Sequence, residues 1–273
     1  MKILVCDRLE EKVLDKFEEL GEITNISESK TKTEDLKSNI VDTEIVVIRS
    51  GTKINKDILE NANNLKIIAR CGVGVDNVDV EEATNKKIYV TNSPNANIIS
   101  VAELTIGLII SAARKIHVSN NSLKDKKWDR NKFLGTELYQ KQLGLVGFGK
   151  AAKEVAKRLS AFGMNIVFYD PYVDSSTIEA KKVDLDELLK TSDVISIHVV
   201  KTEETTNLIN NEKLNLIKKG GILVNTSRGG IIDEESLFQK ANEDLIFAGL
   251  DVFSQEPPDI NETFSKSNIV TTP

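Results

Sequence analysis

Short apolar runs rich in β-branched residues alternate along this chain with segments of helical period. Apolar runs at 2–6, 44–49 and 65–70 predict strands, and the period of 10–20 predicts a helix that ends at Gly21. Strands that alternate with helices in this way are typical of βαβ units and of a largely parallel sheet. The pattern therefore predicts an α/β protein.

The character of the sequence changes near Pro94. A loop around this proline is followed by a long apolar segment at 97–115, which predicts a helix, and then by a charged stretch at 124–141. Five further strand candidates, separated by helical segments, lie at 143–148, 165–170, 193–200, 220–227 and 245–253. Such a series is typical of a doubly wound sheet. We therefore predict two domains, 1–94 and 95–273, because 273 residues are too many for most single cores.

Charge and hydropathy exclude several classes of partner. The formal net charge is −6, from 36 lysines and arginines against 42 aspartates and glutamates. A mildly acidic chain is a poor candidate for binding a nucleic-acid backbone, so no nucleic acid is expected. The longest apolar stretch, at 98–113, is interrupted by Glu103 and is too short to span a bilayer, so no membrane partner is expected either.

The few cysteines and histidines limit the choice of site chemistry. Cys6 and Cys71 are the two cysteines, and neither belongs to a CxxC pair. Together with only two histidines they leave little for a zinc site, so no metal is predicted. Cys6 lies in an apolar run and is predicted to be a buried thiol. Without a disulfide framework, a reducing compartment and hence the cytoplasm is expected.

A glycine-rich segment follows the first strand of the second series. Gly147, Gly149 and Ala152 in LGLVGFGKAA fill the pattern G-x-G-x-x-G/A. A bare match of this kind is weak, but here an apolar strand precedes it and a helical segment follows. The next strand ends at Asp170, where the dinucleotide-binding pattern expects an acidic residue. The whole unit therefore predicts a dinucleotide site.

Each residue type in this unit suits one part of the ligand. Gly147 permits a tight turn, and Gly149 lets the backbone approach a diphosphate that faces the free N–H groups of the helix. Asp170 would accept hydrogen bonds from the adenosine ribose, and its charge would repel a 2′-phosphate. The sequence therefore favours NAD over NADP. A glycine turn in an α/β protein that binds no nucleotide is the alternative.

Further candidate residues follow the later strands, where ligands gather in doubly wound sheets. Arg228 directly follows a strand, and its guanidinium fork matches a carboxylate, although a surface ion pair is an equal alternative. Asp251 lies in an apolar run and needs a partner, for which a nicotinamide amide is suited. Glu256 precedes a proline pair and could equally be an ordinary loop residue. His198 would lie near the cofactor, where a structural role is favoured.

Six segments resemble those of the D-isomer-specific 2-hydroxyacid dehydrogenases, in the order found in that family. They are GVGVDNVD, NSPNANIISVAELTIGLI, KWDRNKFLGTEL, LGLVGFGKAAKEVAKRLSAFGMNIVFYDPY, VNTSRGGIIDEESL and AGLDVFSQEPP. The third of these is most similar to the phosphoglycerate dehydrogenases of the family. The resemblance covers essentially the whole chain. It implies a flavodoxin-like substrate domain at 1–94 and a Rossmann-type, doubly wound parallel sheet for NAD at 95–273.

The resemblance also implies roles for individual residues. The positions that would contact NAD, besides Gly147 and Gly149, are Lys150, Ala151, Asp170, Val199, Thr226 and Asp251. Arg228 would bind the substrate carboxylate and the C2 oxygen, and Glu256 would orient a catalytic histidine. That histidine would take the hydroxyl proton while the hydride moves to the nicotinamide. The other implied substrate contacts are Arg49, Val73, Gly74, Asn97 and, across a dimer, Arg130.

One position departs from the family pattern. The catalytic histidine of the family follows a Thr-Pro or Cys-Pro pair after the next strand, whereas this sequence reads NIVTTP and ends at Pro273. Neither His117 nor His198 aligns with that position, and the closing helix that returns to the substrate domain is missing. We therefore expect a truncated dehydrogenase that binds NAD but turns over poorly, because general acid–base help is worth roughly 10²–10⁴-fold.

The resemblance predicts NAD-dependent oxidation of D-3-phosphoglycerate to 3-phosphohydroxypyruvate, the first step of serine biosynthesis, by a homodimer or homotetramer. One alternative keeps the chemistry but takes glyoxylate, hydroxypyruvate or another 2-hydroxy acid, because a fold does not determine its substrate. Another is a non-catalytic NAD-sensing scaffold, against which the presence of both Arg228 and Glu256 argues. The apolar helix at 97–115 is explained equally well by core packing and by a subunit interface.

Overall fold

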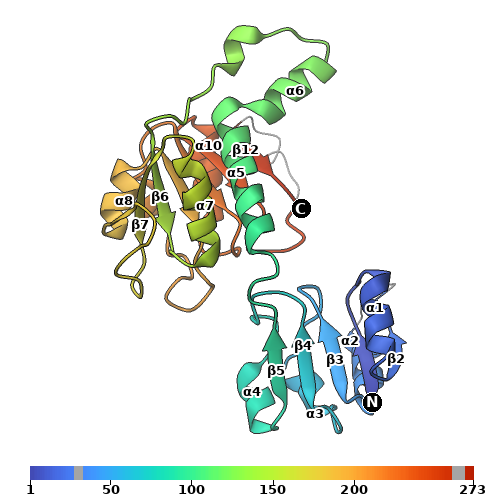
Figure 1. Ribbon diagram of the computed structural model, residues 1–273. Coiled ribbons are helices and arrows are strands. Elements are labelled where there is room, and N and C mark those ends of the chain that lie inside the picture. Colours follow the sequence, from blue (N-terminus) through green and yellow to red (C-terminus); the bar gives the residue numbers. More distant parts are fainter. Residues whose placement is uncertain (28–32, 260–267) are drawn as a thin grey trace. The chain divides into compact units, whose positions relative to one another are not determined.

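The computed structural model describes residues 1–27, 33–259 and 268–273 (Figure 1). The chain divides into two compact units, Met1–Asn97 and Ile98–Pro273. The boundary expected from the sequence, between 94 and 95, lies in the same loop. Both units are α/β with parallel sheets, as predicted.

The described part of the first unit is built on a five-stranded sheet of order β2-β1-β3-β4-β5. Every pair of neighbouring strands is parallel. The strands are β1 (Lys2–Val5), β2 (Glu22–Asn25), β3 (Ile45–Ile48), β4 (Ile67–Arg70) and β5 (Tyr89–Asn92). This order is that of flavodoxin-like sheets, so the predicted fold of this unit is confirmed.

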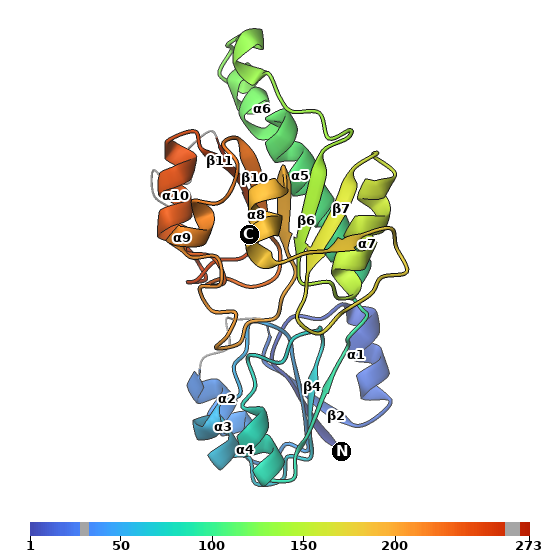
Figure 2. The ribbon, with the colours of Figure 1, turned by 90° about the vertical axis from the view of Figure 1, so that its left-hand side faces the viewer.

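Helices cover both faces of this sheet. Helix α1 (Glu11–Glu18) packs Leu14 and Phe17 on one face, and the other face carries α2 (Thr33–Ile40), α3 (Lys56–Glu60) and α4 (Val80–Asn85). Figure 2 shows α1 on the opposite side of β4 from the other three. Two of these helices begin at side-chain caps, where Asn55 and Asp79 accept hydrogen bonds from the backbone three residues on. The central strands β1 and β3 are therefore buried on both faces.

The described part of the second unit contains a seven-stranded, all-parallel sheet of order β12-β11-β10-β9-β6-β7-β8. Its strands are β6 (Gln142–Val146), β7 (Asn165–Tyr169), β8 (Lys181–Lys182), β9 (Val194–Ile197), β10 (Gly221–Asn225), β11 (Ile246–Leu250) and β12 (Ile269–Thr271). Read from the other edge, the first six strands have the dinucleotide-binding order, with the switch point between β6 and β9. The predicted doubly wound sheet is confirmed.

Two layers of helices enclose this sheet. Helices α5 (Ile98–Arg114) and α7 (Lys150–Ser160) share one buried cluster with one face of the sheet. Helices α8 (Leu185–Thr191) and α10 (Glu234–Asn242), with the short α9 (Asn211–Leu214), cover the other face. Helix α7 buries Ala152, Val155, Ala156 and Leu159, a helical spacing that gives it one apolar face. In none of the described helices are length and apolarity sufficient for crossing a membrane.

An arm leaves the far end of α5. It consists of α6 (Ile116–Lys124) and the 3₁₀ turn η1 (Arg130–Phe133), and it projects from the body of this unit (Figures 1 and 2). Helix α6 has no buried residue. The chain returns to the body at Thr136, whose N–H donates to the carbonyl of Ala113 at 2.7 Å. The arm is thus anchored at its base, and no residue of α6 or η1 is buried.

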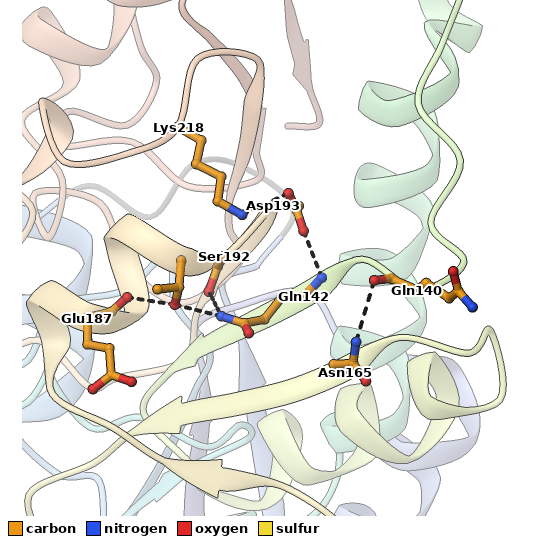
Figure 3. A network of polar contacts seen from close by, with 8 residues as sticks. Gln140, Gln142, Asn165, Glu187, Ser192, Asp193 and Lys218 are labelled. Atoms are coloured by element: carbon orange, nitrogen blue, oxygen red, sulfur yellow. Dashed lines mark hydrogen bonds and ion pairs between the residues drawn. The ribbon is translucent and has the colours of Figure 1, made fainter.

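A polar network joins the amino ends of the strands in the second unit (Figure 3). The carboxylate of Asp193 accepts from the N–H of Gln142 at 2.9 Å and from Nζ of Lys218 at 3.0 Å. Burial raises the pKa of Asp193, but these two hydrogen bonds and the Lys218 charge lower it below its usual value on balance. Ligands of parallel sheets bind at the carboxyl ends of the strands. We therefore interpret this network as structural.

Candidate functional site

The turn after β6 packs against the end of β9. Gly147 has φ +86°, and a Cβ there would lie 2.8 Å from the carbonyl carbon and oxygen of His198. Its N–H donates to the carbonyl of Tyr169 at 2.8 Å, which ties the turn to the end of β7. Positive φ and the close approach both require glycine. The predicted tight turn is therefore present at the switch point of the sheet.

The space above Gly149 fits a diphosphate. Gly149 is the N-cap of α7, with φ −75° and ψ −167°, and a Cβ there would meet no described atom within 4 Å. Lys150 and Ala151 follow as the first two residues of the helix. The free N–H groups of this helix end attract anions, and the missing side chain leaves the backbone open to them. These residues therefore fit the diphosphate of NAD.

Asp170 is held against the same turn. Its Oδ2 accepts from the N–H of Phe148 at 2.8 Å, and its Oδ1 accepts from the N–H of Tyr172 at 2.8 Å. A hollow of about 350 Å³ adjoins it, lined by Tyr169, Asp170, Pro171, Lys182, Val183, Asp184 and Glu187. The cation among these residues, Lys182, is paired with Asp174 at 2.8 Å. The hollow is therefore acidic, which suits a ribose and disfavours a 2′-phosphate.

His198 is a hydrogen-bonded imidazole at the end of β9. Its Nε2 lies 2.9 Å from Oγ of Ser196, a fully buried residue two positions earlier on the same face of the strand. Burial lowers the pKa of His198 to about 4, so the ring is neutral at pH 7. Val199 follows it, and its side chain faces Gly147. The geometry supports the structural role favoured for this histidine.

Protein stability is expected to fall in mild acid because of His198. Its folded pKa of about 4 lies below the ordinary 6.5, so the unfolded chain binds a proton across this interval while the folded chain does not. Between about pH 7 and about pH 5 this group should lower the free energy of unfolding by roughly 2 kcal/mol. Urea unfolding of the wild type and of His198→Asn at both pH values measures the difference. An identical pH dependence in the two proteins would contradict the assignment.

The end of β10 forms a rigid turn around Arg228. Asn225, which is 2% exposed, accepts from the N–H and Oγ of Ser227 at 3.0 and 2.8 Å and donates to the carbonyl of Arg228 at 2.8 Å. Thr226 is buried and shares a hydrogen bond of 2.8 Å with Thr105 of α5. Arg228 therefore stands on a backbone fixed from both sides. Sequence reasoning singled out Thr226 and Arg228 but missed Asn225, whose signal was a polar residue closing a buried strand.

The loop after β11 carries two carboxylates. The N–H of Asp251 donates to the carbonyl of Asn225 at 3.0 Å, and its Oδ1 accepts from Oγ1 of Thr272 at 2.6 Å. Burial raises the pKa of Asp251, and the charge of Glu256 adds to that rise, while the Thr272 hydrogen bond opposes it. Glu256 accepts from the N–H of Phe253 at 3.1 Å. Asp251 was expected to need a partner, and within the described chain that partner is Thr272.

The predicted residues of the first unit lie after its central strands. Arg49 follows β3, and its N–H donates to Oδ2 of Asp7 at 2.5 Å. Burial raises the pKa of the Cys71 thiol, and the positive charges of Arg49 and Arg70 oppose that rise, so both cations lie near it. Sequence reasoning did not single out Arg70. The carboxylate of Asp7 also lies near Cys71, so this edge of the five-stranded sheet carries two guanidinium groups and one carboxylate.

The remaining predicted substrate residues are exposed or loop residues. Val73 and Gly74 lie in the loop after β4, where Nδ2 of Asn92 donates to the carbonyl of Val73 at 2.6 Å. Asn97 is the exposed last residue of the first unit. Arg130 is exposed on η1 of the arm, which follows the C-terminal end of α5, whereas Thr105, the partner of Thr226, lies near the middle of that helix. The structure thus does not bring Arg130 to the Arg228 turn within one chain. Among the described residues, no group of three or more His, Cys, Asp or Glu could hold a metal ion.

Comparisons with known proteins assign the chain to a family. A sequence model described as "D-isomer specific 2-hydroxyacid dehydrogenase, NAD binding domain" matches residues 106–273. The chain is 47% identical to a D-3-phosphoglycerate dehydrogenase of Methanocaldococcus jannaschii, over 100% of this chain and 53% of that protein. It is 44% identical to a hydroxypyruvate reductase of Thermotoga maritima, over 100% of this chain and 90% of that protein. The chain thus spans about half the length of the phosphoglycerate dehydrogenases that it matches.

Solved structures agree with this assignment. The TT0316 protein of Thermus thermophilus superposes with a TM-score of 0.94 at 33% identity, covering 100% of this chain and 89% of that one. An NAD-dependent formate dehydrogenase of Staphylococcus aureus in complex with NAD superposes with a TM-score of 0.89 at 27% identity, covering 100% and 88%. The cofactor of the second unit is therefore NAD, as its glycine turn and Asp170 predicted. The chain belongs to the D-isomer specific 2-hydroxyacid dehydrogenase family.

Proposed function

We propose that the protein is an NAD-dependent D-2-hydroxyacid dehydrogenase that oxidises D-3-phosphoglycerate to 3-phosphohydroxypyruvate in serine biosynthesis. The observation that carries the proposal is that two turns, one suited to a dinucleotide and one to a carboxylate, lie at the same edge of the seven-stranded sheet. The glycine turn after β6 and the rigid Arg228 turn after β10 both lie at the carboxyl ends of its strands. A dinucleotide and a carboxylate can therefore be held side by side.

The residues of the second unit divide the work of binding and positioning. NAD supplies the hydride acceptor when it is bound. Its diphosphate faces Gly149 and the first residues of α7, and Asp170 holds the adenosine ribose. Val199, Thr226 and Asp251 follow β9, β10 and β11, and they would hold the nicotinamide half. The guanidinium of Arg228 would bind the substrate carboxylate and so fix the orientation of the C2 carbon.

Glu256 positions the base that takes the hydroxyl proton. In the family, a glutamate at this position hydrogen-bonds a histidine, and its negative charge raises the basicity of the imidazole. His198 does not fit that part, because its Nε2 lies 2.9 Å from Oγ of Ser196 and burial lowers its pKa to about 4, which makes the imidazole a weak base. His117 lies on α6 of the arm. The proposal therefore assigns the role to neither of them.

The charge of the first unit favours a phosphorylated substrate. The charges of Arg49 and Arg70 both oppose the rise in the pKa of Cys71, so two guanidinium groups lie near this thiol at the carboxyl edge of the sheet. Arginine pairs suit phosphate, because each fork can donate two hydrogen bonds. We assign Arg49 to the phosphate, the loop at Val73 and Gly74 to the carboxylate, and Asn97 to a further polar contact. Arg130 of a second subunit would add charge to the phosphate.

A substrate panel tests the choice of 2-hydroxy acid. The protein saturated with NAD is expected to bind D-3-phosphoglycerate at least tenfold more tightly than D-glycerate, the factor that one charged hydrogen bond supplies. Isothermal titration calorimetry measures both affinities, and the loss of NADH absorbance with 3-phosphohydroxypyruvate, hydroxypyruvate and glyoxylate measures turnover. Equal affinities for the two acids would show that the protein does not recognise the phosphate group, which would contradict this part of the proposal.

One observation favours a second candidate. The chain is 44% identical to the Thermotoga maritima hydroxypyruvate reductase and 47% identical to the Methanocaldococcus jannaschii phosphoglycerate dehydrogenase, so it is almost equally similar to the two relatives. A hydroxypyruvate or glyoxylate reductase would use the same Arg228, Glu256 and NAD turn, without the phosphate contact. The same panel separates the two, because this alternative predicts a preference for the unphosphorylated acids.

The arm is proposed to bind a second copy of this chain. Ile116, Leu123, Trp128 and Leu134 are between 50% and 78% exposed on it. A helix as short as α6 is marginal in water without a surface to pack against. We therefore expect a homodimer or a homotetramer that covers the arm.

Trp128→Asp is expected to shift the protein to monomers, because the charge would be buried without a partner at the interface. Light scattering after size-exclusion chromatography measures the mass. Tyr172→Asp is the matched control, since Tyr172 is an exposed aromatic residue outside the arm, 84% exposed. An unchanged mass for the Trp128 variant would contradict the interface.

The two cysteines support a proposal on the cellular compartment of the protein. Neither Cys6 nor Cys71 forms a disulfide within the described part of the chain. Cys6 is buried, as predicted, and burial together with the charge of Asp7 raises its pKa to about 12. Free thiols persist in reducing compartments, and we propose the cytoplasm.

A further inference from the structure

Two loops of the second unit touch each other at the proposed catalytic residues. One follows β10 and carries Arg228, and the other follows β11 and carries Glu256. A Cβ at Gly229 would collide with the backbone carbonyl of Phe253. The two backbones are therefore in direct contact, and the position of each loop depends on the other.

A single carboxylate bonds to both loops. Oε1 of Glu234 accepts from the N–H of Ser254 at 2.7 Å and from the N–H of Gly230 at 3.4 Å, while Oε2 accepts from Oγ of Ser254 at 2.8 Å. Gly230 belongs to the loop of Arg228, and Ser254 to the loop of Glu256. A charged acceptor makes such bonds stronger than neutral ones.

Glu234 is not needed to begin its own helix. It lies in the first turn of α10, but the N-cap of that helix is Asp233, whose side chain accepts from the N–H and Oγ of Ser236 at 3.0 and 2.7 Å. Glu235, the next residue, belongs to the same first turn and is exposed. The favourable effect of negative charge at a helix start is available from both glutamates. The bonds to Gly230 and Ser254 distinguish Glu234.

We propose that Glu234 is a positioning residue for the dehydrogenase reaction, which holds the Arg228 loop and the Glu256 loop at one fixed separation. This inference rests on the proposed function of Arg228 and Glu256. The substrate carboxylate must lie on Arg228 while its hydroxyl faces the base that Glu256 orients. If the two loops shifted relative to each other, both interactions would weaken at once, because binding and catalytic groups depend on being held in the correct geometry.

Two variants and a control isolate the bonds of Glu234. Glu234→Ala removes both carboxylate oxygens and, with them, all three hydrogen bonds. Glu234→Gln keeps an oxygen for the two N–H groups and offers an amide N–H to the hydroxyl of Ser254, so it is expected to rescue the contact. Glu235→Ala removes a negative charge from the same turn of α10 and leaves the bonds in place.

The first measurement follows the loops without any substrate. Amide hydrogen exchange at 228–230 and 253–256 is expected to be at least tenfold faster in Glu234→Ala, the factor that corresponds to about 1.4 kcal/mol. In Glu234→Gln and Glu235→Ala it should stay near the wild-type rate. Unchanged exchange in Glu234→Ala would overturn the proposal, because the loops would then not depend on the carboxylate.

The second measurement connects the loops to substrate binding. Titration of D-3-phosphoglycerate into the NAD-saturated protein should show at least tenfold weaker binding for Glu234→Ala, with NAD affinity within about twofold of the wild type. Faster exchange with unchanged substrate affinity would overturn the positioning role and leave a merely structural one. If the wild type itself binds no 2-hydroxy acid, the proposed function fails, and hydrogen exchange alone decides whether Glu234 joins the loops.

Discussion

Gly149→Ala is expected to leave the protein folded and to weaken NAD binding by roughly 10- to 100-fold, the range that overpacking by about 1–3 kcal/mol produces. The folding cost is small because the backbone of Gly149 is extended, and a Cβ would meet no described atom within 4 Å. The added methyl group would instead occupy the space that the diphosphate needs. Calorimetric titration with NAD measures the affinity, and urea unfolding measures stability.

Two other glycines serve as references for this experiment. At Gly147, φ is +86° and an added Cβ would lie only 2.8 Å from the carbonyl of His198. Gly147→Ala should therefore lower the free energy of unfolding by about 2–4 kcal/mol and also weaken the affinity for NAD. Gly220→Ala has a similar φ of +78° but no described atom within 4 Å, so it isolates backbone strain. Wild-type affinity in Gly149→Ala would place the diphosphate elsewhere.

The central strands were predictable because burial leaves a pattern. Strands β3, β9 and β10 are buried almost throughout, so each reads as a continuous apolar run. The strands that the pattern missed are β2, β5, β8 and β12, all at sheet edges. Strands β2 and β5 have mainly exposed residues, β8 consists of two exposed lysines, and β12 has only three residues. Edge strands form through backbone pairing with a buried neighbour, and that leaves little trace in hydropathy.

In the candidate site too, some contacts were predictable from the sequence and others were not. The glycine turn and Asp170 belong to one strand–turn–helix–strand unit, so their relation is local, and the spacing together with the flanking strands and helix predicted it. Asp251 and Thr272 are 21 residues apart, and Glu234 and Ser254 are 20 apart. These partners meet because β11, β12 and α10 pack together, and sequence spacing carries no information on such contacts. Glu234 reads in the sequence as one of two ordinary acidic residues at the start of a helix.

Arg228→Leu is expected to weaken binding of the 2-hydroxy acid by roughly two to three orders of magnitude, because removing one partner of a hydrogen-bonded charge pair costs about 2–5 kcal/mol. Arg228→Lys should recover only a small part of the affinity. A lysine keeps the charge, but it cannot donate in a planar fork, and its flexible stem is not held by the Asn225 turn. Titration of D-3-phosphoglycerate into the NAD-saturated variants measures the loss.

Two comparisons test whether the loss of substrate affinity is specific to Arg228. NAD affinity should remain within about twofold of the wild type in both variants, since the glycine turn and Asp170 do not involve Arg228. Arg158→Lys is the matched control, because Arg158 pairs with Glu154 one turn earlier on α7, and such helical pairs contribute only about 0.3–0.5 kcal/mol. Wild-type substrate affinity in Arg228→Leu would show that the carboxylate is held elsewhere. The rigid turn built by Asn225 would then need a different ligand to explain it.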